Sequence, residues 1–109
     1  MDIQMKRGIL DVCVLAAIQY EESYGYQIIK DIKPFVEISE STLYPILRRL
    51  EASELLTVRS AEHNGRLRKY YRITPAGRAR LAEFEAEWEQ MKNIYQFVTR
   101  GEGTLNEKK

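Results

Sequence analysis

The stretch Leu56–Ile73, with the sequence LTVRSAEHNGRLRKYYRI, decides the fold because it contains the dipeptide Asn64-Gly65 between two runs of strand-forming residues. Asn and Gly readily adopt the two positive φ angles of a type I′ turn, so the dipeptide predicts a β-hairpin with a two-residue loop. Counting outward from this loop gives the cross-strand pairs His63–Arg66, Arg59–Tyr70, Val58–Tyr71, Thr57–Arg72 and Leu56–Ile73. Because side chains alternate between the faces of a strand, the hairpin has one apolar face and one polar, basic face.

Three helices are expected before the hairpin. From Lys6 to Tyr20 apolar residues cover every side of a helix, so this helix must be buried on two sides. A chain of 109 residues has room for only one domain, and we expect a partner subunit to cover the second side. A second helix starts between Ser23 and Gly25, with Ser23 as a candidate N-cap, and ends at Pro34.

A third helix begins at Ser39 or Ser41, since either serine can accept backbone N–H groups as an N-cap. Its apolar residues form a single stripe, which consists of Leu43, Ile46, Leu47 and Leu50. Pro45 falls in the first or second turn, where a proline removes at most about one hydrogen bond and does not exclude the helix. The second and third helices therefore have the order of a helix-turn-helix.

A long helix is expected after the hairpin. Thr74 is a suitable N-cap, Pro75 suits the first helical position, and the helix runs to about Thr99. Its apolar residues recur at intervals of three and four, as in a helix that pairs with another long helix, and are Leu81, Phe84, Trp88, Met91, Tyr95 and Val98. Residues 100–109 show no periodicity and are expected to form a disordered tail.

These elements predict a mainly α fold with a small β-hairpin. Residues 5–74 form a winged helix-turn-helix for DNA binding, and residues 75–99 form a C-terminal dimerisation helix. The first and last helices carry more apolar surface than one small subunit can cover, so we expect a homodimer. The predicted dimer interface consists of Leu10, Val14, Leu81, Phe84, Trp88, Met91, Tyr95 and Val98.

The charge is concentrated around the third helix and the hairpin. The chain carries +1 in total, whereas the segment Arg48–Arg80 has nine basic residues and three acidic ones and carries +6. Basic side chains around a helix that fits the major groove are typical of proteins that bind double-stranded DNA. The candidate DNA contacts are Ser41, Thr42, Tyr44, Arg48 and Arg49 of the third helix and Asn64, Arg66, Arg68 and Lys69 of the hairpin. A two-fold dimer predicts an inverted-repeat operator.

Three strings resemble the PadR family of bacterial transcriptional regulators: YGYQI at residues 24–28, STLYPILRRLE at 41–51 and GRLRKYYRIT at 65–74. The chain also resembles the short subgroup of that family, which has a single C-terminal helix. The resemblance implies a homodimer whose C-terminal helices pack against the partner's first helix. It also implies repression that is usually relieved by a small phenolic or drug-like effector.

The effector site follows from the same resemblance. In multidrug-binding members of the short subgroup a tryptophan of the C-terminal helix lines a pore between the subunits, and Trp88 falls at the matching place. The resemblance implies that Trp88 contacts a planar aromatic effector. Phe84 and Tyr95 lie on the same apolar seam, and methionine adapts to ligands of different outline, so we expect Phe84, Met91 and Tyr95 to extend this site. The alternative is that Trp88 is only a residue of the dimer core.

Other classes of protein fit less well. One histidine, one cysteine, no metal-ligand cluster and no glycine-rich phosphate loop argue against an enzyme, a metal site or a cofactor. The longest apolar run, Val12–Ile18, is too short for a bilayer, and we expect a cytoplasmic protein without membrane contact. A winged-helix module that binds proteins and not DNA is the remaining alternative, and salt-dependent affinity for duplex DNA distinguishes the two.

Overall fold

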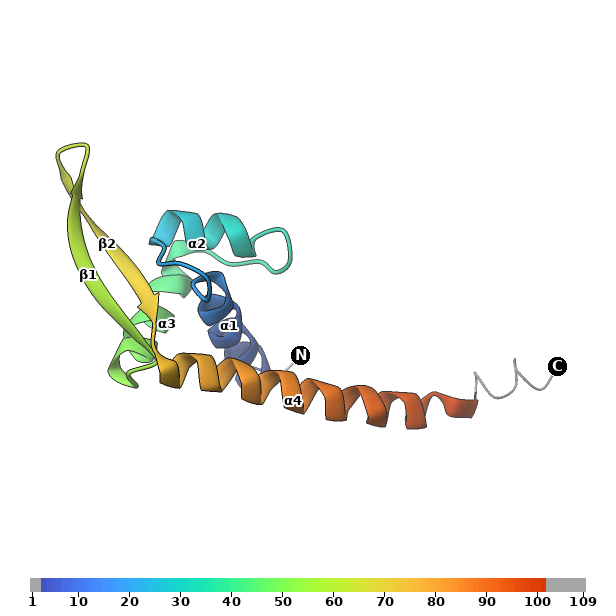
Figure 1. The fold of residues 1–109 in the computed structure, drawn as a ribbon. Helices are drawn as coiled ribbons and strands as arrows, with labels where there is room; N and C mark the ends of the chain where they lie inside the picture. Colours follow the sequence, from blue (N-terminus) through green and yellow to red (C-terminus); the bar gives the residue numbers. More distant parts are fainter. Residues whose placement is uncertain (1–2, 102–109) are drawn as a thin grey trace.

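The computed structural model describes residues 3–101, with side chains from residue 8 onward, so most of the predicted tail at residues 100–109 lies outside the described residues. The elements are α1 (Ile3–Ala17), α2 (Gly25–Ile32), α3 (Glu40–Ala52), β1 (Leu56–His63), β2 (Arg66–Ile73) and α4 (Pro75–Val98). The molecule measures 67 × 25 × 25 Å. Figure 1 shows the hairpin at one end, while α4 runs along the helical body and continues past it at the other.

The hairpin has the predicted register. Asn64 and Gly65 both have positive φ angles, of 53° and 80°, and all five predicted cross-strand pairs are present. The apolar face turns inward, since Leu56, Tyr71 and Ile73 are buried. The two-residue loop therefore determines which side chains of the hairpin, hereafter the wing, enter the core.

A third extended segment adjoins the wing. Ser23 exchanges two backbone hydrogen bonds with Tyr71, of 3.1 and 2.7 Å, and so pairs with the outer edge of β2. The prediction that Ser23 caps α2 is wrong, because Tyr24 occupies the N-cap position. Ser23 is buried beside β2, where its backbone groups bond to a strand and not to a helix end.

The turn after α3 contacts the start of α4. Glu54 has a positive φ of 62°, and the amides of Glu54 and Leu55 bond back to the carbonyls of Glu51 and Leu50, which forms a Schellman motif. Thr74 is the N-cap of α4, as predicted, and its hydroxyl oxygen accepts a hydrogen bond from the amide of Gly77 at 3.1 Å. The same hydroxyl donates to the carbonyl of Glu54 at 2.8 Å, so the start of α4 is fixed to the end of α3.

Helix α1 lies at the centre of the core and packs against α2, α3 and α4 of the same chain. Leu10 and Val14, which the sequence predicts in the dimer interface, retain only 4% and 0% of their exposure within their own chain, so little of their surface is left for a partner to cover. The sequence correctly showed an apolar surface all round α1, but the first half of α4 covers part of it within the chain. Leu81, on that half, is partly buried against the same core.

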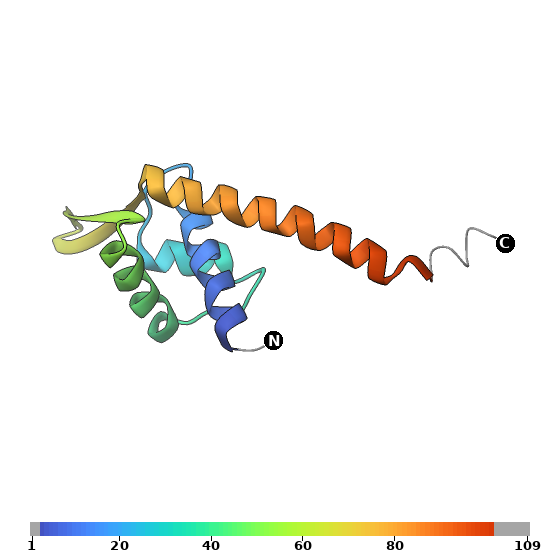
Figure 2. The ribbon, with the colours of Figure 1, turned by 90° about the horizontal axis from the view of Figure 1, so that it is seen from below.

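The second half of α4 has no cover in the chain. Figure 2 shows this half extending away from the other helices. Trp88 is 56% exposed and Val98 is 69% exposed, and the other large apolar residues left exposed on α4 are Met91, Ile94, Tyr95 and Phe97. We call Phe84, Trp88, Met91, Ile94, Tyr95 and Val98 the distal stripe.

Within residues 3–101 no helix has the length and apolarity required to cross a membrane.

The close packing at the start of α4 gives the first prediction. A Cβ atom at Gly77 would collide with the carbonyl oxygen of Leu55 and lie 2.6 Å from Cγ1 of Ile73. We expect Gly77→Ala to lower the free energy of unfolding by about 1–3 kcal/mol, because backbone and core atoms must move. Urea denaturation at one protein concentration measures this change.

Gly8→Ala is the matched control. Gly8 lies within α1, and a Cβ atom there would meet nothing within 4 Å. Alanine has the higher helix propensity, so this variant is expected to keep or raise the stability, by up to about 1 kcal/mol. Equal effects of the two substitutions would contradict the proposed role of the Gly77 contact.

Candidate DNA-binding interface

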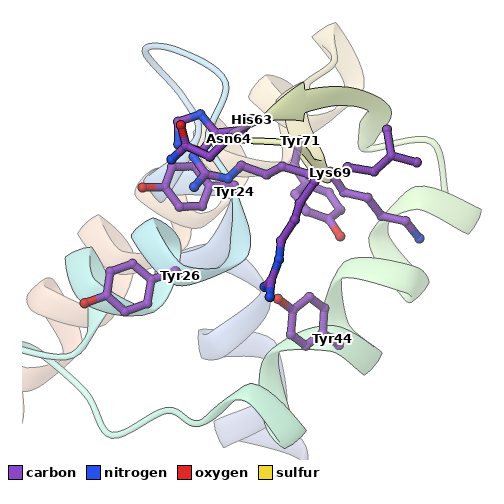
Figure 3. Close-up of a pocket in the computed structure, with 10 residues that line it drawn as sticks. Tyr24, Tyr26, Tyr44, His63, Asn64, Lys69 and Tyr71 are labelled. Atoms are coloured by element: carbon purple, nitrogen blue, oxygen red, sulfur yellow. The ribbon is translucent and has the colours of Figure 1, made fainter.

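A groove of about 460 Å³ separates the wing from the starts of α2 and α3. Its wall contains three basic side chains and no acidic one, and its lining residues are Tyr24, Tyr26, Tyr44, His63, Asn64, Arg66, Leu67, Arg68, Lys69 and Tyr71. Figure 3 shows Tyr44 reaching up from α3, with Tyr24 and Tyr26 on the α2 side and His63 and Asn64 at the tip of the wing. The groove thus combines positive charge with aromatic faces and phenolic hydroxyls.

Close packing orients Tyr44 in this groove. A Cβ atom at Gly25 would collide with the hydroxyl of Tyr44 and lie 2.9 Å from Cζ, so the phenol rests directly on the first residue of α2. Tyr71, on the opposite wall, is buried, and this burial raises the pKa of its phenol. The phenol of Tyr71 is therefore a neutral group near neutral pH, able to donate or accept a hydrogen bond.

The start of α3 presents polar residues to solvent. Ser41 and Thr42 are exposed in its first turn, and Tyr44 and Arg48 follow on the exposed side. The hydroxyl of Ser39 lies 3.0 Å from that of Ser41 and 3.3 Å from that of Thr42, so three hydroxyls gather at this helix end. These residues lie on the side of α3 opposite its buried stripe.

Arg49 lies elsewhere on α3. Its guanidinium forms an ion pair with Asp11 of α1. The structure therefore gives the Arg49 charge a partner within the chain, where the sequence predicted a contact with DNA. This pair ties α3 to the central helix α1.

The basic residues of the wing form two groups. Arg66 and Lys69 are exposed beside the groove and enter no ion pair recorded among residues 8–101. The guanidinium of Arg68 instead lies 3.8 Å from the centre of the Tyr24 ring, in a cation–π contact. Arg59 lies 4.8 Å from the centre of the Tyr70 ring. Part of the positive charge of the wing is thus engaged within the molecule.

Glu22 pairs with two arginines of the wing, Arg59 and Arg72. Its carboxylate accepts a hydrogen bond of 3.0 Å from Nε of Arg59 and forms a second contact with the same guanidinium. Arg72 lies 3.9 Å from the carboxylate. The hydrogen bond from Arg59 holds the pKa of Glu22 below its usual value.

The sequence reasoning missed Glu22 and Tyr24 as residues of the site. Both precede α2, while their partners Arg59 and Arg68 lie in the wing, far along the chain. No periodicity connects segments so distant in sequence. The available signal was the placement of an acidic and an aromatic residue on the short segment that leads into α2.

No three His, Cys, Asp or Glu side chains gather into a potential metal site in the described part of the chain.

Comparisons with known proteins agree with this geometry. Residues 14–83 match the model of the family described as the transcriptional regulator PadR-like family. A transcriptional regulator of Mycobacterium tuberculosis is 44% identical over 70 residues, which cover 62% of this chain and 65% of that protein. A PadR-like transcription factor of Bacteroides fragilis has a similar structure, with a TM-score of 0.79, 34% identity and coverage of 87% of this chain and 94% of that one.

A solved complex with DNA is also similar. PadR of Bacillus subtilis, in complex with operator DNA, has a TM-score of 0.66 and 25% identity, and the match covers 70% of this chain and 45% of that one. The family model spans α3, the wing and the start of α4, the elements that build and support the groove. On these grounds the chain belongs to the PadR-like family of transcriptional regulators.

Proposed function

We propose that this protein is a sequence-specific regulator that binds double-stranded DNA as a homodimer and has no catalytic activity. The groove between α3 and the wing is the observation that carries the proposal, because its lining is basic and aromatic without an acidic residue. Phosphates favour such a surface, and a helix start rich in hydroxyls suits contacts with base edges and backbone. The similarity to a PadR protein in complex with operator DNA supports this assignment.

The DNA contacts are assigned from exposure and pairing. Ser41, Thr42, Tyr44 and Arg48 would enter or border the major groove, and Asn64, Arg66 and Lys69 would reach phosphates from the wing. We assign Arg49 and Arg68 to internal contacts, since each already has a partner in the chain. In this proposal residues 5–74 form the DNA-binding domain.

Two exposed apolar surfaces support the homodimer. The distal stripe is one, and the other is a groove of about 370 Å³ between α1 and α2, lined by Cys13, Ala16, Ala17, Tyr20, Asp31, Ile32 and Phe35. A two-fold axis would allow the stripe of each subunit to cover apolar surface of the other, so residues 75–99 would be the dimerisation helix. The operator would then be an inverted repeat with half-sites about one helical turn apart.

The distal stripe also offers a surface for a planar ligand. The rings of Phe84 and Trp88 are stacked, with centroids 6.5 Å apart and an interplanar angle of 15°. Met91 and Tyr95 extend this surface, and methionine adapts to ligands of different outline. We therefore propose a repressor that a planar aromatic effector releases from DNA. Such an effector must bind one dimer geometry more tightly than another to change DNA affinity.

The first test of this function is salt-dependent binding to duplex DNA. Arg66→Ala and Lys69→Ala should weaken binding to every duplex and flatten the plot of log affinity against log salt by about one unit per lost phosphate contact, or about two per dimer. Lys33→Ala, at the far end of α2, removes the same charge outside the groove and should leave the slope unchanged. A wild-type protein without salt-dependent affinity would favour the protein-binding module.

The second test concerns the dimer. Sedimentation at micromolar concentration should give a dimeric mass, and Tyr95→Asp should shift it toward the monomer, because a carboxylate would enter the apolar interface. Asn93→Asp places the same side chain on another face of α4 and should remain dimeric. A monomeric wild-type protein, or an equal shift in both variants, would contradict an interface along the distal stripe.

The third test concerns the effector. Trp88 is the single tryptophan, so its emission should change when planar cationic dyes or phenolic acids bind beside it. Trp88→Ala should lower the affinity for a responding dye, measured by the anisotropy of the dye itself. An unchanged emission across the panel, or an unchanged dye affinity in the variant, would leave Trp88 as a residue of the dimer core alone.

A further inference from the structure

Three consecutive residues between α1 and α2 hold the wing, each by a different interaction. Glu22 forms the ion pairs with Arg59 of β1 and Arg72 of β2, Ser23 makes the backbone bridge to Tyr71, and Tyr24 accepts Arg68 on its ring. We call residues 22–24 the strap. Its partners in the wing are Arg59 of β1 and Arg68, Tyr71 and Arg72 of β2, so the strap joins the body to both strands of the wing.

Glu22 is the charged anchor of the strap. Its side chain is 22% exposed, compared with 55% for Arg59 and 72% for Arg72, so the carboxylate lies beneath two more exposed guanidinium groups. Arg59 contacts it through two nitrogen atoms, a fork geometry that fixes direction as well as distance. One carboxylate thus restrains a residue of each strand of the wing.

Tyr24 and Tyr70 extend the restraint toward the tip of the wing. Their rings meet edge to face with centroids 5.9 Å apart, and Arg68 lies over the Tyr24 ring while Arg59 lies over the Tyr70 ring. Arg59 therefore contacts both Glu22 and Tyr70. A change at Glu22 would act through Arg59 and Tyr70 on Tyr24, which lines the groove beside the wing.

We propose that Glu22 is a positioning residue for sequence-specific DNA binding. The carboxylate sets the angle of the wing above the start of α3, and it withholds Arg59 and Arg72 from phosphates that any DNA sequence would offer. This inference rests on the proposed function. Its consequence is a divided effect: without the Glu22 charge, affinity for arbitrary DNA rises while the preference for the operator falls.

The experiment compares Glu22→Gln with Glu21→Gln. Duplexes selected from a random pool by the wild-type protein supply the operator, and a scrambled duplex supplies the reference. Both variants remove one negative charge, so both should bind scrambled DNA more tightly than wild type. The preference is the dissociation constant for the scrambled duplex divided by that for the operator. Only Glu22→Gln should lower this ratio, by about threefold to fivefold, the range expected of a partly exposed ion-pair network.

A merely structural role for Glu22 would give a different result. Partial unfolding weakens the apparent affinity for both duplexes by the same factor, so the ratio of dissociation constants would not move. Arg59→Gln provides the second measurement. If Glu22 acts through Arg59, the double variant should lose no more preference than either single variant, as a double-mutant cycle requires of coupled residues.

The outcomes separate the inference from the function on which it rests. A wild-type protein with no selectivity for any duplex would overturn the proposed function and the inference with it. A selective wild-type protein whose Glu22→Gln variant keeps the full ratio would overturn the inference alone. Additive losses in the double variant would show that Glu22 does not act through Arg59.

Discussion

The register of the wing is the constraint on which the rest of the structure depends. Asn64 and Gly65 close a two-residue loop, and that loop places Tyr71 and Ile73 in the core. A slip of one residue would turn both outward and bring Arg72 inward. The same register directs the backbone of Tyr71 toward Ser23, which anchors the body to the edge of β2. The two-residue loop at Asn64-Gly65 therefore determines how the core, the wing and the groove are arranged.

Patterns along the chain predicted most of the fold. The Asn-Gly dipeptide gave the register, the stripe from Leu43 to Leu50 gave the buried face of α3, and Thr74 gave the start of α4. Each of these signals is local, because turn chemistry, helix periodicity and capping all act within a few residues. The exposed polar face of α3 followed from the same periodicity.

Contacts between distant segments escaped those patterns. Periodicity shows that α1 is apolar on all sides, but it does not say which element covers each side. Leu10 and Val14, which the sequence predicts in the dimer interface, are buried within their own chain. Composition showed a basic wing but not that Arg68 stacks on Tyr24 or that Arg49 meets Asp11. The charge of a segment limits what it can bind, and only its tertiary contacts show which charges remain available.

If the protein is the proposed homodimer, the protruding half of α4 would make the lifetime of the protein depend on its concentration in the cell. Isolated helices shorter than about 12–15 residues are only marginally stable in water. The part of α4 beyond Phe84 resembles such a helix, because no other element of its chain covers its apolar residues. In the proposed dimer, a second subunit would supply the missing cover, so dilution would fray the helix and expose it to proteases. Scarce subunits would then be degraded faster than abundant ones, and a falling level of the regulator would accelerate its own removal.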